Sequence, residues 1–200
     1  MTILLAAAIA YLLGAIPFGY LLVKWTTGRD VRGGGSGNIG ATNVLRTTGR
    51  AAGIATLLLD IGKGYLAVWI AGRIAQQSEI AMCVATLAVM AGHAYPVFLR
   101  FRGGKAVASF VGSFLRLTPL ALAAALVVFV AVVAWTRYIS MGSVVCAATF
   151  PLAVWLIDKS VVMVATAVIA GAFIIYKHSS NIRRVHAGSE SVFTFGAHQS

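Results

Sequence analysis

The sequence contains few charged residues and very few acids. Of its 200 residues, 10% are charged and 60% are hydrophobic, whereas soluble domains have about 25% charged and about 45–50% apolar residues. This composition indicates a protein embedded in a bilayer, and we expect one compact membrane domain over residues 1–200. Five residues are acidic, and no two of them share a loop. A phosphatidyl-transferring enzyme, which needs a carboxylate cluster for metal ions, is therefore disfavoured.

Cysteine is also scarce. The two cysteines, Cys83 and Cys146, lie within apolar runs, so we expect free buried thiols. They form neither a disulfide framework nor a metal-ligand spacing, and we predict no metal and no cofactor. The sequence also lacks a nucleic-acid-binding motif, although the net charge is +11. Its basic residues lie in short segments between apolar runs, which favours membrane topology and anionic substrates over nucleic acid.

Seven apolar runs are candidate membrane spans. They are 2–23, 51–72, 80–99, 106–115, 119–136, 138–157 and 160–176. A spanning helix needs about 20 residues, so 106–115 crosses only if preceding polar residues join its helix or the bilayer thins. The first run has full membrane length and no basic residue before it, so we expect a spanning helix rather than a signal peptide.

The basic residues predict the orientation. If all seven runs cross, one side holds only Arg73, Arg116 and Lys159. The other side holds Lys24, Arg29, Arg32, Arg46, Arg50, Arg100, Arg102, Lys105, Arg137, Lys177, Arg183 and Arg184. Because cytoplasmic loops are enriched in basic residues, we expect the N-terminus outside and the C-terminus in the cytoplasm. The predicted fold is an all-α bundle of seven transmembrane helices, one of them short.

The segment GGGSGNIGATN contains G-x-G-x-x-G at Gly35, Gly37 and Gly40, with Asp60 20 positions further on. This pattern is the fingerprint of dinucleotide binding only when a β-strand precedes it within a soluble βαβ unit. Here a spanning helix precedes it, and Asp60 lies inside the next apolar helix. The dinucleotide interpretation is therefore rejected.

The same glycines still allow backbone N–H groups to approach an anion, and a following helix N-terminus adds a favourable dipole. Ser36, Asn38, Thr42 and Asn43 supply neutral donors, and Arg46 supplies a positive charge. We interpret this segment as a phosphate-binding loop, with a flexible interhelical turn as the alternative.

A second polar segment, HAYPVFLRFRGGKAVAS, combines Gly103 and Gly104 with Arg102 before them and Lys105 after them. The glycines allow close approach, and Lys105 is expected to bind phosphate. Arg102 has an equally good explanation as a cation that flanks a membrane span. His93 is either a structural hydrogen-bonding residue or part of the site.

A third segment, KHSSNIRRVHAGSE, places His178, Asn181 and Glu190 beside Arg183 and Arg184. Contacts with lipid headgroups would explain the arginines alone, but a histidine with an amide three residues on favours a site. The predicted topology puts all three polar segments on the cytoplasmic side.

Asp60 and Lys63 lie three residues apart on one helix face. Ionisable residues within a membrane usually face the protein interior and pair with each other. We expect the pair to support the site structurally. The alternative is that Asp60 acts as the general base.

The segments IPFGYLLVK, GSGNIGATNVLRT, GHAYPVFLRFRGGKAVAS and KHSSNIRRVHAGSE resemble, in the same order, those of the bacterial acyl-phosphate:glycerol-3-phosphate acyltransferases, the PlsY family. The resemblance covers essentially the whole chain. It departs where the family usually has GGKG-V-A-T and this chain has Ala106 and Ser109. Neither change removes a charge. We therefore expect at most a different start of the following helix, with the chemistry unchanged.

The resemblance implies transfer of a fatty acyl group from acyl phosphate to the 1-hydroxyl of glycerol 3-phosphate. The products would be 1-acyl-glycerol 3-phosphate and phosphate, in the first step of phospholipid synthesis. It also implies a site on the cytoplasmic face of the bacterial inner membrane, contact with membrane lipids, and as a further candidate partner the soluble enzyme that makes acyl phosphate. The H-x₄-D motif of other glycerol-phosphate acyltransferases is absent from the sequence, which agrees.

The predicted catalytic residues are Ser36, Arg46, Lys105, His178 and Asn181. The predicted substrate-binding residues are Gly35, Gly37, Asn38, Gly40, Thr42, Asn43, His93, Arg102, Gly103, Gly104, Arg183 and Glu190. Ser36, Arg46 and Lys105 would bind phosphates, the asparagines would orient substrates or the oxyanion, and Glu190 would hold a cation. The base is either His178 or a phosphate oxygen of the donor. An anion transporter is the alternative function, but no internal repeat supports it.

Overall fold

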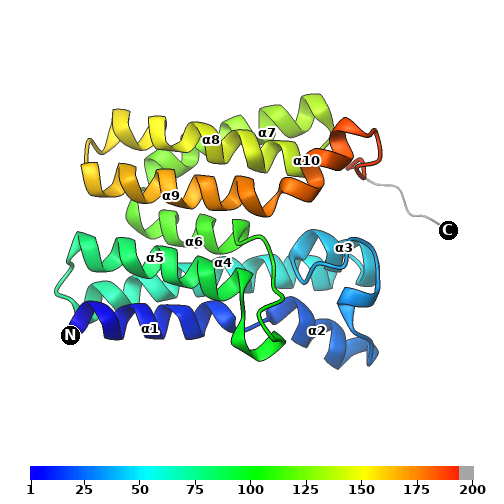
Figure 1. Cartoon of the computed structure of the whole chain (residues 1–200), viewed down its shortest axis with the longest axis horizontal. Coiled ribbons are helices and arrows are strands. Elements are labelled where there is room, and N and C mark those ends of the chain that lie inside the picture. The colour runs from blue at the N-terminus through cyan, green and yellow to red at the C-terminus, as the bar shows by residue number, and fades with distance from the viewer. Residues whose placement is uncertain (194–200) are drawn as a thin grey trace. The chain divides into compact units, whose positions relative to one another are not determined.

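The computed structural model describes residues 1–193, and these residues form helices and loops without a β-strand (Figure 1). The helices are α1 (Thr2–Ala15), α2 (Phe18–Thr27), η1 (Val31–Gly33), α3 (Ala41–Thr48), α4 (Arg50–Ile74), α5 (Glu79–Ala94), η2 (Val97–Leu99), α6 (Val107–Leu117), α7 (Pro119–Thr136), α8 (Ile139–Ile157), α9 (Val161–Lys177) and α10 (Ser179–His186). The predicted all-α architecture is confirmed for this part of the chain.

Five segments among the described residues are long and apolar enough to span a membrane. They are Thr2–Thr27, Arg50–Ile74, Glu79–Leu99, Pro119–Thr136 and Ile139–Ile157. The bent pair α9 and α10, which meets at 53°, makes a sixth if it is counted as one span. The predicted short run forms α6, which has only 11 residues. The count of seven crossings and the orientation stay predictions.

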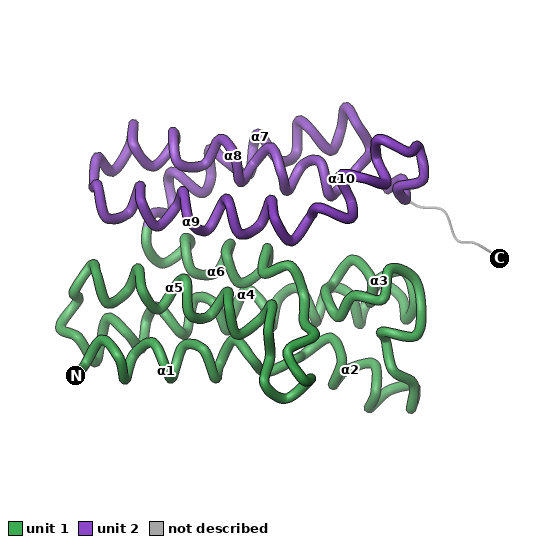
Figure 2. The backbone as a smooth tube through the Cα atoms, viewed as in Figure 1, with its two compact units in different colours: residues 1–117 green, residues 118–200 purple. Residues whose placement is uncertain are grey.

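The chain divides into two compact units (Figure 2). Unit 1, Met1–Leu117, contains α1 to α6, with α1 packed on α4 and α5, and α4 packed on α6. Unit 2, Thr118–Ser200, contains α7 to α10, with α8 packed between α7 and α9. A single domain over the whole chain stays a prediction.

The first span is broken between α1 and α2. Ile16 has an extended backbone (φ −64°, ψ 113°), and Pro17 takes the N-cap position of α2. A proline has no N–H to continue the helix, and it disfavours helical geometry in the residue before it. The break therefore leaves helix-end carbonyl groups that need partners within the protein.

Glycines allow the helices of unit 1 to approach each other closely. A Cβ atom on Gly14 would lie 2.2 Å from the carbonyl oxygen of Val89, and one on Gly92 would lie 2.1 Å from that of Tyr11. These contacts join α1 to α5. Membrane helices associate through close packing, because lipid is as apolar as their side chains, and small residues at the crossing permit it.

The short helix α6 packs on α4 in the same way. A Cβ atom on Gly64 would lie 2.3 Å from the carbonyl oxygen of Ser109, and one on Gly112 would lie 1.9 Å from that of Ile61. Ser113 also donates a hydrogen bond of 3.4 Å to the carbonyl of Gly64. The contact fixes α6 and the polar segment that leads into it.

Gly64→Ala should therefore destabilise the protein, by about 1–3 kcal/mol, because the new methyl group overpacks the crossing of α4 and α6. Gly62→Ala is the matched control, since no atom lies within 4 Å of its added Cβ, and helix propensity favours alanine there by up to about 1 kcal/mol. Thermal unfolding in detergent measures both. Equal midpoints for the two variants would contradict the prediction.

Candidate functional site

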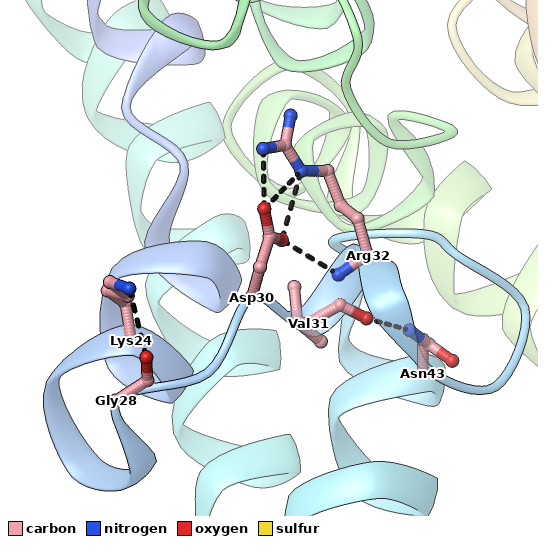
Figure 3. Close-up of polar contacts among 6 residues, drawn as sticks. All are labelled: Lys24, Gly28, Asp30, Val31, Arg32 and Asn43. Atoms are coloured by element: carbon pink, nitrogen blue, oxygen red, sulfur yellow. Dashed lines mark hydrogen bonds and ion pairs between the residues drawn. The ribbon is translucent and has the colours of Figure 1, made fainter.

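The amide of Asn43 organises the glycine-rich segment between η1 and α3, residues 33–43, which we call the first loop. Its oxygen accepts a hydrogen bond of 2.8 Å from the backbone N–H of Ser36. Its nitrogen donates to the carbonyl of Asn38, at 2.8 Å. It also donates to the carbonyl of Val31, at 3.2 Å, the contact that Figure 3 shows. The side chain is buried, so its observed contacts hold the loop in shape.

Two glycines of the first loop have backbone conformations that other residues avoid. Gly35 has a φ of +57° and Gly37 a φ of +69°. A Cβ atom on Gly35 would also lie 2.2 Å from the Asn43 amide oxygen. The turn and the buried amide therefore require glycine at position 35.

The predicted phosphate ligands lie in the outer part of the first loop and in α3, the helix that follows it. Ser36 and Arg46 are exposed, and Thr42 is half-buried in the first turn of α3. The Asn38 side chain accepts a hydrogen bond of 2.8 Å from the N–H of Gly40, the N-cap residue of α3. The hydroxyl of Ser36 therefore lies in the turn before α3, and the guanidinium of Arg46 lies in α3 itself.

An ion pair stiffens the chain just before this loop (Figure 3). Asp30 accepts three hydrogen bonds from the Arg32 guanidinium, the shortest at 2.6 Å, and one from the backbone N–H of Arg32. The Arg32 side-chain hydrogen bond is the main reason that the pKa of Asp30 is lowered. Lys24 donates to the carbonyl of Gly28, at 2.9 Å, where α2 ends. The contacts of Lys24 and Arg32 thus stabilise the turn between α2 and η1.

The second polar segment folds back on the end of α5, and we call residues 100–105 the second loop. The N–H groups of Gly103 and Gly104 donate to the carbonyls of Ala94 and His93, at 3.2 and 3.0 Å. A Cβ atom on Gly104 would lie 2.1 Å from Nε2 of His93. The glycine pair is therefore needed for this close approach.

Cations flank the glycine pair of the second loop. Arg102 is exposed, and Lys105 is half-buried. Ala106, where the family usually has glycine, is buried with a φ of +62°. A left-handed conformation costs a non-glycine residue about 1–2 kcal/mol. Ala106 therefore strains the backbone just before α6, where a glycine would not.

The two loops share one hydrophobic core within unit 1. Leu99 of η2 packs with Val31, Ile39 and Val44 from the first loop and its neighbours, and with Val23 of α2. The structure thus brings together two of the three segments singled out from the sequence.

His93 contacts a charged pair inside unit 1. Asp60 and Lys63 form an ion pair of 2.7 Å with side chains 3% exposed, which confirms their predicted pairing. His93 Nδ1 lies 3.6 Å from the Asp60 carboxylate, and its side chain is 4% exposed. The sequence did not reveal this contact, because Asp60 lies on α4 and His93 on α5. The His93 side chain is thus buried inside unit 1 rather than exposed to solvent.

The third polar segment lies in unit 2. His178 stands between α9 and α10, 3% exposed, with Nδ1 2.8 Å from the carbonyl oxygen of Ile174. A carbonyl only accepts hydrogen bonds, so Nδ1 carries the proton, and in the neutral ring Nε2 is the basic nitrogen. The fold thereby selects one tautomer.

Glu190 ties α10 to α8. Its carboxylate accepts hydrogen bonds from Asn181, Ser140 and Arg184, at 2.6, 2.8 and 2.7 Å. Burial raises the pKa of Glu190, but these three hydrogen bonds outweigh that effect and lower it below its ordinary value of 4.5. Glu190 thus holds the Arg184 cation, while Arg183 is exposed. Because this segment belongs to unit 2, its meeting with the two loops stays a prediction.

Glu190→Gln should loosen α10, because charge-assisted hydrogen bonds are worth about 1.5–3 kcal/mol. A carboxyl group with a lowered pKa stabilises the fold above its ordinary pKa and loses that effect as the pH falls through the lowered value. The wild type should therefore lose protection in α10 as the pH falls below 4.5, and the variant should lack it already at pH 7.

Amide hydrogen exchange, corrected for intrinsic rates, measures this protection. Asp158→Asn is the control, because the Asp158 carboxylate accepts its hydrogen bond from Thr118, where α7 begins. Equal protection of α10 in wild type and Glu190→Gln would contradict the prediction.

Comparisons with known proteins agree with one another. The profile of the family "Glycerol-3-phosphate acyltransferase" matches residues 4–188. The glycerol-3-phosphate acyltransferase of Geotalea daltonii is 49% identical over 92% of this chain and 94% of its own length. That of Geobacter sulfurreducens is 45% identical over 95% and 97%, respectively.

Two crystal structures are also similar. Both are of PlsY, described as an integral membrane glycerol 3-phosphate acyltransferase. Its glycerol 3-phosphate form has a TM-score of 0.91 and 35% identity, and its lysophosphatidic acid form has 0.89 and 34%. Each match covers 97% of this chain and 96% of the crystallised one. The chain therefore belongs to the glycerol-3-phosphate acyltransferase family, as a multi-pass integral membrane enzyme of the PlsY type.

Proposed function

We propose that this protein transfers a fatty acyl group from acyl phosphate to the 1-hydroxyl of glycerol 3-phosphate. The observation that carries the proposal is the pair of glycine-shaped loops on one core, with the exposed Arg46 in the helix that follows the first loop and the exposed Arg102 in the second. Two phosphate-binding loops suit a reaction in which both substrates carry phosphate. The glycerol 3-phosphate form of the similar PlsY structure supports the same acceptor.

The chemistry asks mainly for positioning. The acceptor hydroxyl oxygen attacks the acyl carbonyl carbon, the bond from that carbon to the phosphate oxygen breaks, and inorganic phosphate leaves with the bonding electrons. Acyl phosphate is already activated, so alignment and stabilisation of the oxyanion supply most of the catalysis. Ser36 in the first loop and Arg46 in α3, together with Arg102 and Lys105 in the second loop, would hold the phosphates.

The proton of the acceptor hydroxyl needs a base. A protein base of the His–carboxylate type relies on the carboxylate to stabilise the imidazolium. His93 has such a partner in Asp60, but its side chain is buried and its Nε2 faces Gly104. Nδ1 of His178 donates to the carbonyl of Ile174 rather than to a carboxylate. We therefore assign the proton to a phosphate oxygen of the donor, and assign His178 and Asn181 to orienting the glycerol hydroxyls. This assignment requires the third segment to reach the two loops.

The proposed location follows the predicted topology. The three polar segments face the cytoplasm at the bacterial inner membrane, where glycerol 3-phosphate is available and a soluble enzyme could deliver acyl phosphate. The acyl chain would remain among the apolar helices.

The purified protein should acylate glycerol 3-phosphate with palmitoyl phosphate and not with palmitoyl-CoA. Thin-layer chromatography of labelled lysophosphatidic acid, together with phosphate release, measures the reaction. Equal activity with both donors would contradict the proposed donor. Phosphate flux across liposomes without acyl transfer would favour the anion transporter instead.

Gly35→Ala should lower kcat/KM by about 10²-fold, since misplacing a binding group by about 1 Å has that effect. The added methyl group would displace the Asn43 amide and strain a φ of +57°. Gly33→Ala is the matched control, because nothing lies within 4 Å of its Cβ. The same kinetics for both variants would show that the shape of the first loop does not matter.

A further inference from the structure

Unit 1 contains a charged pair inside a membrane span that the reaction itself does not use. Asp60 and Lys63 of α4 are 2.7 Å apart with side chains 3% exposed, and the proposed reaction assigns neither of them a step. Removing two charges from water is costly, and an apolar pair of similar size often serves stability as well or better. The contacts of this pair therefore point to a role other than stability.

Lys63 contacts the N-terminal end of α2 and the break before it. Its ammonium donates a hydrogen bond of 2.8 Å to the carbonyl of Ile16, in the break after α1. It also lies 5.6 Å from the ring centroid of Phe18, the first residue of α2. Helix C-termini carry partial negative charge, so the ammonium stabilises the break and fixes where α2 begins.

The position of α2 is passed on to the first loop. A Cβ atom on Gly19 would lie 2.0 Å from the carbonyl oxygen of Ile39, which is part of that loop. Val23, one turn further along α2, packs with Ile39 and Val44. Because the backbone of α2 at Gly19 lies directly against the backbone of Ile39, a shift of α2 would move the first loop.

Asp60 connects the same pair to the second loop. Its carboxylate lies 3.6 Å from Nδ1 of His93. The opposite edge of that ring faces Gly104, where a Cβ atom would lie 2.1 Å from Nε2. Rotation or displacement of the imidazole would therefore displace the glycine pair.

We propose that Asp60 and Lys63 are positioning residues that set the first and second loops relative to each other. This role rests on the proposed function, in which both loops bind phosphate groups of the reactants. The two charges act through Ile16 and α2 on one side and through His93 on the other. Reaction geometry would then depend on a pair that neither substrate touches.

The test is the double variant Asp60→Leu/Lys63→Met, which removes both charges together and leaves no unpaired ion. The Ile16 carbonyl keeps the N–H of Phe18 as a donor, at 3.2 Å, so the variant's thermal midpoint in detergent should stay close to that of the wild type. Its KM for glycerol 3-phosphate or palmitoyl phosphate should rise about 10- to 100-fold, because the loops lose their alignment. A folded double variant with both KM values and kcat within about twofold of the wild type would overturn the proposal.

His93→Gln is the second variant, since it breaks the link to the second loop and leaves the ion pair in place. If the double variant does not fold, a raised KM in His93→Gln supports the proposal, and unchanged kinetics overturn it. Thr86→Val is the control for loss of a buried polar group. Thr86 is fully buried on α5, and its hydroxyl donates to the carbonyl of Met82 in its own helix. The KM values of this variant should therefore not change.

Calorimetric titration with glycerol 3-phosphate separates this proposal from the proposed function. If the wild type lacks acyl transfer from palmitoyl phosphate, the proposed function fails. The ratio of Kd values between the double variant and the wild type still reports on the loops. A Kd at least tenfold weaker in the double variant supports positioning, and an unchanged Kd with a lowered thermal midpoint reduces the pair to a structural role.

Discussion

Polar groups at membrane depth must find their partners within the protein, because lipid offers no hydrogen bonds. This constraint governs unit 1. The chain breaks between α1 and α2, and the Ile16 carbonyl is stabilised by Lys63. The ammonium in turn requires the Asp60 carboxylate, and that carboxylate brings His93 close to it. A buried chain of charged and polar groups thus runs from the break after α1 through α4 to α5.

Glycine contributes to this architecture in two ways. At helix crossings, as at Gly64, it removes the side chain that would keep two backbones apart. In the loops it provides left-handed turns, as at Gly35, and room for a buried ring, as at Gly104. The same property lets the backbone of the second loop lie against His93 and that of the first loop against Asn43. A fold of this kind is suited to phosphorylated reactants that need alignment more than activation.

The membership of the chain in the glycerol-3-phosphate acyltransferase family restricts the chemistry further. The residues around the loops fit an enzyme that works by electrostatics. Arg46 and Arg102 are exposed, whereas the His93 imidazole is engaged with a buried carboxylate. In unit 2, the carboxylate of Glu190 is occupied by three donors from the protein. Asp60, His93 and Glu190 thus hold structure, whereas Arg46 and Arg102 are the proposed phosphate ligands.

The sequence by itself determined the membrane-embedded all-α fold, the three polar segments and the Asp60–Lys63 pair, because hydropathy and helical spacing are local properties. It also identified Gly35, Gly103 and Gly104, but as phosphate-approach residues rather than as space for Asn43 and His93. Only the tertiary structure decided that His93 meets Asp60, that Asn43 closes the first loop and that Glu190 reaches Ser140, 50 residues away. These contacts join groups from different helices and turns, and their partners are chosen by how the backbones pack, which the spacing of residues along one helix does not encode.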